Sequence, residues 1–249
     1  MCIRDRKKVL VLLALVCFQG QAQRVFQLQA VNIDPSDAEQ FEMVEKSFAT
    51  PLAQEAKKKG EIADWYLLKR TNGGRASDKV LYVWVHVYDS IEQMVNTDDW
   101  WETQEKYGVP SSVVYGSVER DPIGNFTYKI EKSYETNRLG KYVIFNWAAP
   151  TDLAASLKLA DEISSSFKSN MKKSGMTSWG MATRVYPQGA DYEPLFFWDE
   201  YETYQQVMEH LMNKAVLEAV KPEMFEKLFR LLPSGFANRY IMEGITGTN

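Results

Sequence analysis

Cysteine is almost missing from this chain of 249 residues, which has two, Cys2 and Cys17. Both fall within the first 22 residues, a stretch with the features of a removable targeting segment. The rest of the chain has no disulfide, no thiol nucleophile and no thiolate metal ligand. We therefore expect about 227 residues to be held together by hydrophobic cores alone, as domains of ~100 residues routinely are.

Motifs for catalysis and for metal binding are also lacking. The sequence has no Gly-x-Ser-x-Gly, no phosphate loop and no dinucleotide fingerprint. Its two histidines, His86 and His210, have no second ligand at metal-binding spacing, so no metal site is predicted, and no cofactor either. The acids of Asp98–Trp101 lack the glycine and distant glutamate of a calcium loop. Because adjacent helix residues cannot share a face, only one of its two tryptophans is expected in the core.

Long hydrophobic runs are missing except at the very start. The basic residues there are Arg4, Arg6, Lys7 and Lys8. The apolar run Val9–Phe18 follows, and Gly20–Ala22 supplies the small residues that a signal peptidase reads. Ten apolar residues are too few to span a bilayer, which needs about 20. We predict a signal peptide over residues 1–22 and an exported, soluble protein, periplasmic or extracellular. Val16 precedes Cys17 where a lipid anchor would need a small residue, which disfavours lipidation.

An excess of positive charge is absent as well. Lys and Arg number 29 against 33 Asp and Glu, a net charge of −4. Removal of residues 1–22 takes away four basic residues and one acid, which changes the net charge to −7. Such a protein has no electrostatic reason to bind nucleic acid or anionic lipid. We expect neither as a partner, leave a small-molecule ligand open, and find the composition compatible with a monomer.

The sequence does contain a long internal repeat. The matching segments are Tyr88–Val95 with Tyr201–Met208, Lys58–Gly60 with Lys173–Gly175, and Trp65 with Trp179. This spacing is too long for a solenoid unit and indicates a duplicated domain. We predict one repeat over residues 24–136 and a second over 141–245, joined at Thr136–Gly140.

Each half has the pattern of strand, helix, hairpin, helix and strand. In the first half we expect strands at Val25–Ile33, Ala63–Arg70, Val80–Tyr88 and Phe126–Lys132, with helices from about Phe41 to Gly60, bent at Pro51, and from Ser90 to Lys106. In the second half we expect strands at Tyr142–Ala148, Met176–Tyr186, Glu193–Glu200 and Asn238–Glu243, with helices at Leu153–Met171, Thr203–Asn213 and Pro222–Leu232. A βαββαβ unit is the ferredoxin-like plait, with both helices on one face of its sheet. The predicted fold class is α+β: two tandem ferredoxin-like repeats pair their bare sheet faces in a pseudo-dimeric α/β barrel.

This pattern resembles the dimeric α/β-barrel superfamily, which includes stress-responsive barrel domains, small antibiotic-biosynthesis-type monooxygenases and NIPSNAP-like proteins. More closely, the succession of Pro51, Gly60, Trp65, a glycine loop and Val87-Tyr88-Asp89 is similar to uncharacterised exported proteins of marine bacteria. The resemblance covers nearly all of residues 24–245. It concerns topology and spacing rather than a catalytic signature, so it permits a cofactor-independent oxygenase or isomerase without specifying one.

The strand Val80–Tyr88 separates its residue types by alternation. The aromatic, polar-tipped positions are Tyr82, Trp84, His86 and Tyr88, and the aliphatic positions are Leu81, Val83, Val85 and Val87. We expect the aliphatic set under the helices and the aromatic set inside the barrel, with Leu195, Phe197, Asp199 and Tyr201 equivalent in the second half. The predicted ligand-binding residues are Tyr82, Trp84, His86, Phe197 and Asp199. A slip of one residue would exchange the two faces.

Two positions are candidates for chemistry. His86 could act as a general base near neutral pH, and Asp199 at the equivalent register could form an acid–base pair with it. His86 could equally be a structural hydrogen-bonding group. Some relatives in the superfamily bind haem between helices and sheet, so the resemblance raises His210 as an axial ligand; an ordinary helix-face histidine is the favoured reading.

Three functions remain open from the sequence. The first is non-enzymatic binding of a small, partly apolar molecule between the sheets. The second is a cofactor-independent monooxygenase or isomerase, and the third is a structural domain with a barrel filled by aromatic side chains.

Overall fold

The computed structural model describes residues 23–71, 79–97, 99–116, 118–136, 138, 140–212 and 221–249, and the expected signal peptide lies outside them. The first half contains β1 (Val25–Ile33), α1 (Ala38–Val44), the π-helix η1 (Glu45–Ala49), α2 (Thr50–Lys59), β2 (Asp64–Arg70), β3 (Val80–Tyr88), α3 (Ile91–Asn96), α4 (Gln104–Tyr107), α5 (Ser111–Tyr115) and β4 (Arg120–Glu135). The second half contains β5 (Tyr142–Ala148), α6 (Leu153–Ser174), β6 (Met176–Tyr186), β7 (Leu195–Tyr201), α7 (Tyr204–Leu211), α8 (Pro222–Leu231) and β8 (Asn238–Gly247). Within this described part, no helix combines the length and apolarity needed to cross a bilayer.

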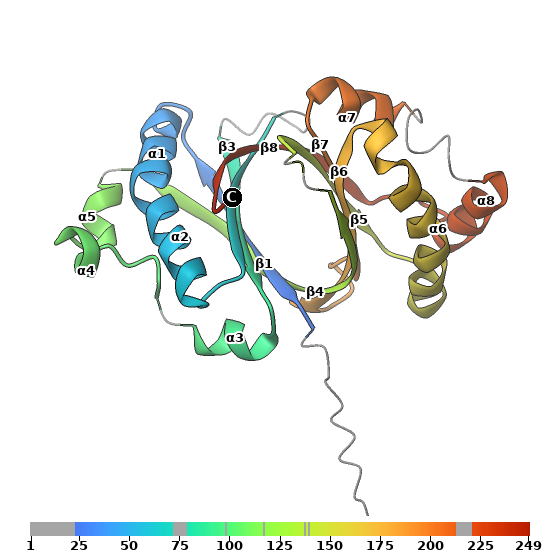
Figure 1. The fold of residues 1–249 in the computed structure, drawn as a ribbon, viewed down its shortest axis with the longest axis horizontal. Coiled ribbons are helices and arrows are strands. Elements are labelled where there is room, and N and C mark those ends of the chain that lie inside the picture. Colours follow the sequence, from blue (N-terminus) through green and yellow to red (C-terminus); the bar gives the residue numbers. More distant parts are fainter. Residues whose placement is uncertain are drawn as a thin grey trace, which may run out of the picture.

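The eight strands form one closed antiparallel barrel, in the order β1-β3-β2-β8-β5-β7-β6-β4. The first half contributes β4-β1-β3-β2 and the second contributes β8-β5-β7-β6, so the strand order is the same in each half. Two seams join the halves, β2 with β8 and β4 with β6. The helices of each half cover the outside of its own strands, on opposite sides of the barrel (Figure 1).

The helix ends follow from local sequence. Asp152 caps α6 by accepting a hydrogen bond of 2.9 Å from the backbone of Ala155. Thr203 and Gln206 form a reciprocal capping box at the start of α7. The helix before β2 ends at Gly60, whose φ of 76° lies in the left-handed region that glycine tolerates. These signals place the end of α2 and the starts of α6 and α7 close to the predicted residues.

A π-helical segment lies just before Pro51, where we predicted a bend. The helix continues from Ala38 to Lys59, and η1 interrupts its α-helical winding just before the proline. Proline donates no hydrogen bond and its ring clashes with the preceding turn of a regular helix. The wider turn of η1, in which the backbone of Thr50 bonds to the carbonyl of Glu45, accommodates it.

The single helix expected from Ser90 to Lys106 is wrong. It ends as α3 at Asn96, and α4 and α5 follow as separate short helices. The Thr97 hydroxyl bonds to the carbonyls of Glu61 and Gln93, at 2.7 and 2.6 Å, and its backbone turns into an extended conformation. Beyond this break Trp100 is buried whereas Trp101 is 47% exposed, so one of the two tryptophans is in the core, as expected.

The buried apolar side chains form three clusters. One lies between the sheet and the helices of the first half and includes Phe41, Trp65 and Tyr82. A second lies beneath the helices of the second half and includes Ile163 and Tyr201. The third fills part of the barrel interior. Because the barrel is closed, its interior residues face one another and no helix.

Candidate functional site: a cavity inside the barrel

Aromatic rings fill one end of the barrel interior. Tyr128 stacks on Phe26 with ring centroids 5.1 Å apart, and Trp147 donates a hydrogen bond of 2.9 Å to the Tyr128 hydroxyl. Phe196 packs against Trp147 at 5.1 Å, and the Arg70 guanidinium lies 4.0 Å from the ring centre of Tyr240. The Trp147 indole N–H and the Tyr128 hydroxyl thus satisfy each other inside the ring cluster.

The other end holds a cavity of about 500 Å³, within the range of small-molecule sites. Its apolar lining comprises Phe26, Leu28, Leu68, Val85, Val87, Ile130, Val143, Phe145, Phe196, Trp198 and Ile245. These residues come from both halves. Trp198 lies across Gly180, where an added β-carbon would meet the indole at 1.9 Å, so glycine is required for this ring to pack there.

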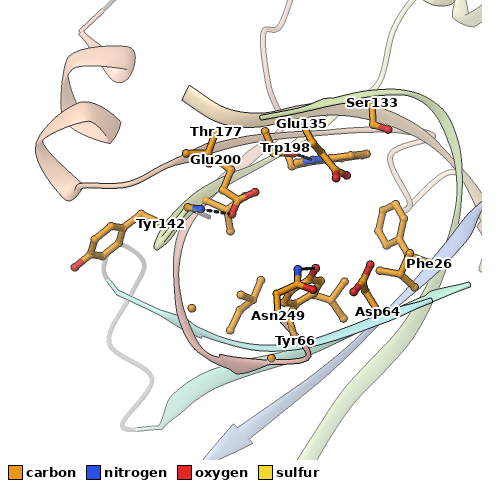
Figure 2. Close-up of a pocket in the computed structure, with 18 of the residues that line it drawn as sticks. Phe26, Asp64, Tyr66, Ser133, Glu135, Tyr142, Thr177, Trp198, Glu200 and Asn249 are labelled. Carbon is orange, nitrogen blue, oxygen red and sulfur yellow. Dashed lines mark hydrogen bonds between the residues drawn. The ribbon is translucent and has the colours of Figure 1, made fainter. Parts of the chain in front are cut away.

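Polar side chains line the mouth of this cavity (Figure 2). They come from strand ends that the barrel brings together: Asp64 and Tyr66 of β2, Glu135 of β4, Thr177 of β6 and Glu200 of β7. Burial raises the pKa of Glu200 to about 7, and the nearby charge of Glu135 adds to this rise. Glu200 therefore changes its protonation state near neutral pH.

Gly140 creates the space in which Glu200 lies. Its backbone N–H donates a hydrogen bond of 3.0 Å to Glu200 Oε1. A β-carbon on Gly140 would lie 2.5 Å from Thr177 Oγ1 and 2.6 Å from Glu200 Oε1, so the two oxygens are neighbours at this point. The Thr177 side chain is buried, and its hydroxyl has no hydrogen-bond partner among the described residues.

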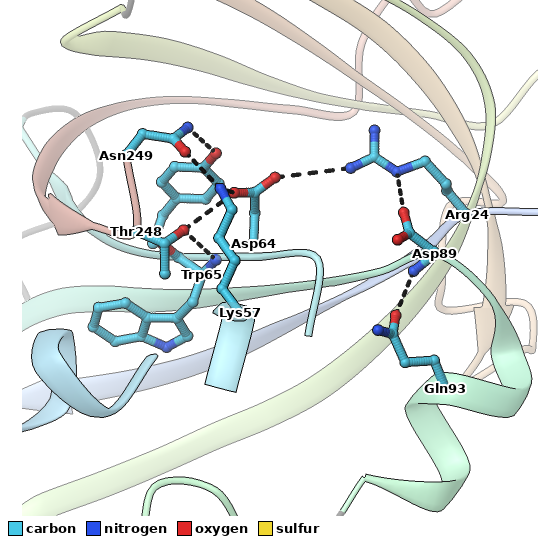
Figure 3. Close-up of polar contacts among 9 residues, drawn as sticks. Arg24, Lys57, Asp64, Trp65, Asp89, Gln93, Thr248 and Asn249 are labelled. Atoms are coloured by element: carbon cyan, nitrogen blue, oxygen red, sulfur yellow. Dashed lines mark hydrogen bonds and ion pairs between the residues drawn. The ribbon is translucent and has the colours of Figure 1, made fainter. Parts of the chain in front are cut away.

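Asp64 is held by cations at the same rim (Figure 3). Lys57 donates to one of its oxygens and Arg24 lies 3.8 Å from the other. Thr248 donates to Asp64 at 3.1 Å, and Asn249 joins Lys57 to the Tyr66 hydroxyl by bonds of 2.8 Å each. These contacts hold Thr248 and Asn249 beside the cavity, and the two cations balance the negative charge of Asp64.

The predicted orientation of Tyr82, Trp84 and His86 is wrong. All three lie beneath the helices of the first half, where Tyr82 donates to Glu42 at 2.9 Å and Trp84 donates to Glu45 at 3.0 Å. The physical reason is hydrogen bonding: helix carboxylates satisfy the polar tips of Tyr82 and Trp84 on that side. The aliphatic residues of β3 instead face the barrel, which was the alternative register.

His86 packs against the ring of Trp100, with centroids 5.8 Å apart. Neither of its ring nitrogens has a partner among the described residues, and burial lowers its pKa to about 4. It is therefore neutral at physiological pH, and it does not line the cavity. Asp199 lies in the other half, and the structure does not bring the two candidate residues together.

Phe197 and Asp199 also face their helices rather than the barrel, contrary to expectation. Phe197 packs on Phe236 with centroids 5.8 Å apart. Asp199 accepts a hydrogen bond of 2.7 Å from Asn146 and lies 3.8 Å from His210 Nε2. Because the strands of the two halves are equivalent, the same wrong choice of sheet face misplaced the predicted residues of β3 and of β7.

A haem ligand does not fit at His210. Its Nδ1 is hydrogen-bonded to the Tyr201 hydroxyl at 2.7 Å, and its Nε2 faces Asp199. Nδ1 is thus engaged in a hydrogen bond, and Nε2 lies near a carboxylate inside a buried network. Burial lowers the pKa of His210, with the charge of Asp199 opposing the effect. The hydrogen bond to Tyr201 links α7 to β7 and occupies Nδ1, and the His210 ring is buried between them.

Other surfaces offer less. A depression of about 680 Å³ lies beside α2 and α3, but its Glu55 pairs with Lys59 and Lys106 at 3.0 Å each. Among the residues described, no cluster of three or more His, Cys, Asp or Glu side chains is arranged to hold a metal ion.

Neither a protein-family model nor a curated protein matches this sequence. Solved structures do match its fold. A proposed monooxygenase of Fusobacterium nucleatum superposes with a TM-score of 0.60 at 8% identity, covering 92% of this chain and 95% of its own. A proposed monooxygenase of Lactobacillus acidophilus gives 0.55 at 10% identity, covering 91% and 96%. An anthrone oxidase-like protein gives 0.51 at 11% identity, covering 91% and 93%.

At these identities the likeness concerns the fold alone. It confirms the fold class, an α+β protein with a closed eight-stranded antiparallel barrel. The sequence analysis missed the cavity residues because they lie on the opposite face of the same strands and alternate with the predicted residues. The signal that could have found them is Glu200, an acid on the otherwise aromatic β7 face that also carries Phe196 and Trp198.

Proposed function

We propose that this protein binds a small, partly apolar molecule inside its barrel. The main observation in support is the cavity of about 500 Å³, which has an apolar body and a polar mouth. Shape and lining of this kind are typical of small-molecule sites. The apolar part of a ligand would pack against Leu28, Phe145 and Phe196, and its polar part would lie at the mouth near Glu200 and Tyr66.

A matched pair of substitutions tests this proposal. Val85 lines the cavity, whereas Val95 on α3 is 67% exposed. Val85→Trp fills the cavity, so we expect it to weaken binding of the neutral fluorophore N-phenyl-1-naphthylamine by about tenfold or more, measured by fluorescence titration. Val95→Trp makes the same chemical change outside the barrel and should bind like the wild type. Unaltered binding by a folded Val85→Trp variant, with folding checked by thermal melting, would refute the proposal.

A cofactor-independent enzyme of the monooxygenase or isomerase type is the second candidate. The observation that favours it is the pKa of Glu200, raised by burial to about 7, where a carboxyl can accept and return protons at neutral pH. Mass spectrometry of a bound molecule incubated with protein and air distinguishes the two functions. An unchanged molecule supports binding alone, whereas conversion that Glu200→Gln abolishes supports catalysis.

The equal strand order of the two halves supports a tandem duplication, with ferredoxin-like repeats over residues 24–136 and 141–245 as a pseudo-dimer. The domain limits and the exported location stay predictions. Mass spectrometry of the protein from its own host gives a direct test of export, since cleavage after residue 22 fixes the mature N-terminus.

A further inference from the structure

The charges at the mouth of the cavity are unequally neutralised. The rim carries Arg24, Asp64, Glu135, Arg138, Lys141 and Glu200. Its three cations pair with acids: Arg24 with Asp64 and Asp89, Arg138 with Glu202, and Lys141 with Glu243. Glu135 and Glu200, in contrast, form no ion pair within the described part of the chain. The negative charges of these two glutamates at the rim are therefore not balanced by an ion pair among the described residues.

The negative charge at the mouth also affects the pKa of Tyr66. Burial raises the pKa of its phenol, and the charges of Asp64, Glu200 and Glu135 raise it further. Three carboxylates therefore act on one point at the mouth. Only Asp64 has its charge compensated by neighbouring cations (Figure 3).

A second, independent feature lies beside Glu200. Thr177 is 1% exposed, and its hydroxyl has no partner among the described residues although it borders the cavity. Leaving a buried hydroxyl unpaired is unfavourable, so such groups generally have a hydrogen-bond partner in the working state. The hydroxyl and the Glu200 carboxylate lie side by side against Gly140 and line the same cavity, and oxygens of both kinds can accept a hydrogen bond.

The apolar wall next to these acceptors also suits a cation. Trp198 and Glu200 are two residues apart on β7 and share the barrel face. A cation near a tryptophan ring is attracted by its π electrons. The mouth therefore combines a carboxylate, a second oxygen acceptor and an indole, and the barrel beyond it is apolar.

We propose that the ligand is an amphiphilic amine whose protonated nitrogen is held by Glu200 and Thr177, with its apolar body inside the barrel. The inference rests on the proposed binding function and names its ligand class. Glu135 adds negative charge at the mouth and need not contact the ammonium group directly. The ammonium group supplies both the missing counter-charge and the missing hydrogen-bond donor.

Three probes that share one chain length test the head group: octylamine, 1-octanol and octanoate, each titrated as a competitor of N-phenyl-1-naphthylamine. We expect the wild type at pH 7.5 to bind octylamine about tenfold or more tightly than the other two, since a charged hydrogen bond contributes about 1.5–3 kcal/mol. Glu200→Gln should reduce this preference to about threefold or less while leaving octanol and the fluorophore unaffected. Glu162→Gln, an equal change of charge on the outside of α6, should keep the preference.

Thr177→Val separates ligand binding from structure. It removes the unpaired hydroxyl and keeps the side-chain shape, so thermal stability should stay equal or rise whereas octylamine affinity falls. Octylamine affinity should also rise between pH 6 and pH 8 as Glu200 ionises. Equal affinity for the three probes, or tightest binding of octanoate, would overturn the amine inference while the binding function stands. Failure of the fluorophore and all three probes to bind would instead refute the binding function itself.

Discussion

At the scale of single residues, two glutamates with raised pKa values lie on opposite sides of the sheet. Glu200 lies at the mouth of the cavity, and Glu45 lies fully buried between η1, β3 and α5. Tyr115 donates to Glu45 at 2.7 Å and Trp84 donates to its other oxygen at 3.0 Å. Burial nevertheless raises the pKa of Glu45 to about 7, against the lowering effect of these two hydrogen bonds. Glu45 is thus a structural acid, away from the cavity.

Replacement of Glu45 by Gln should change how stability depends on pH. A raised folded-state pKa means that the folded protein retains the proton more strongly than the unfolded chain does. Its stabilising contribution is complete below pH 4.5 and is lost as the pH rises through about 7. Glu45→Gln cannot ionise, so relative to the wild type it should gain up to about 3 kcal/mol between pH 5 and pH 8.

Urea denaturation at the two pH values measures this difference. Glu39→Gln, an exposed change in the first turn of α1, is the matched control and should show no such gain. A free-energy difference between Glu45→Gln and wild type that stays constant from pH 5 to pH 8 contradicts the assignment.

The residue level is also where prediction from sequence failed. Alternation along β3 correctly separated Trp84 and His86 from Val83 and Val85, because side chains alternate strictly along a strand. Alternation does not tell which set faces the helices. That choice depended on Glu42 and Glu45, whose carboxylates are far from β3 in the sequence and become its hydrogen-bond partners only in the fold.

At the scale of elements, α7 is attached to the sheet by a buried polar contact rather than by apolar packing alone. The Tyr201 hydroxyl and His210 Nδ1 are 2.7 Å apart, and both residues are buried. Asn146 extends the network from Asp199 to the Arg239 guanidinium, at 2.7 Å for each bond. A polar network in such a site is stabilising only while each member keeps its partner.

Tyr201→Phe should therefore destabilise the protein by about 1–3 kcal/mol, because it leaves a ring nitrogen of His210 buried without a partner. The double variant Tyr201→Phe/His210→Phe should lose less than the sum of the two single changes, since it removes both polar groups. Chemical denaturation measures all three free energies of unfolding. Tyr186→Phe, at a position 68% exposed, should cost little. Strictly additive losses would show that the bond contributes no coupling.

The positions of the strands were the most predictable feature of this structure. Strands β1, β3, β5 and β6 begin and end at the predicted residues because alternation and turn signals are local. The expected helix from Ser90 to Lys106 failed because Thr97 finds a carbonyl partner outside its own helix, that of Glu61. Local propensity could not anticipate that competing contact.

At the scale of the whole molecule, the barrel makes the two halves depend on each other. The seams of β2 with β8 and of β4 with β6 use strands that would otherwise be open sheet edges. The interior cluster takes Phe26 and Leu28 from the first half and Phe145 and Phe196 from the second. Composition and the internal repeat predicted this architecture, because duplication and alternating strands require the bare sheet faces to pair. They could not predict that one end of the barrel is filled and the other hollow, since that depends on how individual rings from both halves pack.

Such interdependence predicts that the halves unfold as one cooperative unit. Ile33 of β1 and Ile144 of β5 are both fully buried, each beneath the helices of its own half. Ile33→Ala should cost about 2–5 kcal/mol, as is usual for a large-to-small change in a core. Because the seams and the interior cluster couple the halves, the most protected amides of β5 and β7 should lose as much protection from hydrogen exchange as those of β1 and β3. Ile144→Ala should produce the reciprocal effect in the first half. Ile123→Ala, at a position 50% exposed, should alter neither half. Loss of protection confined to the half that carries the substitution would show that each half folds on its own and that the barrel is an assembly of two independent domains.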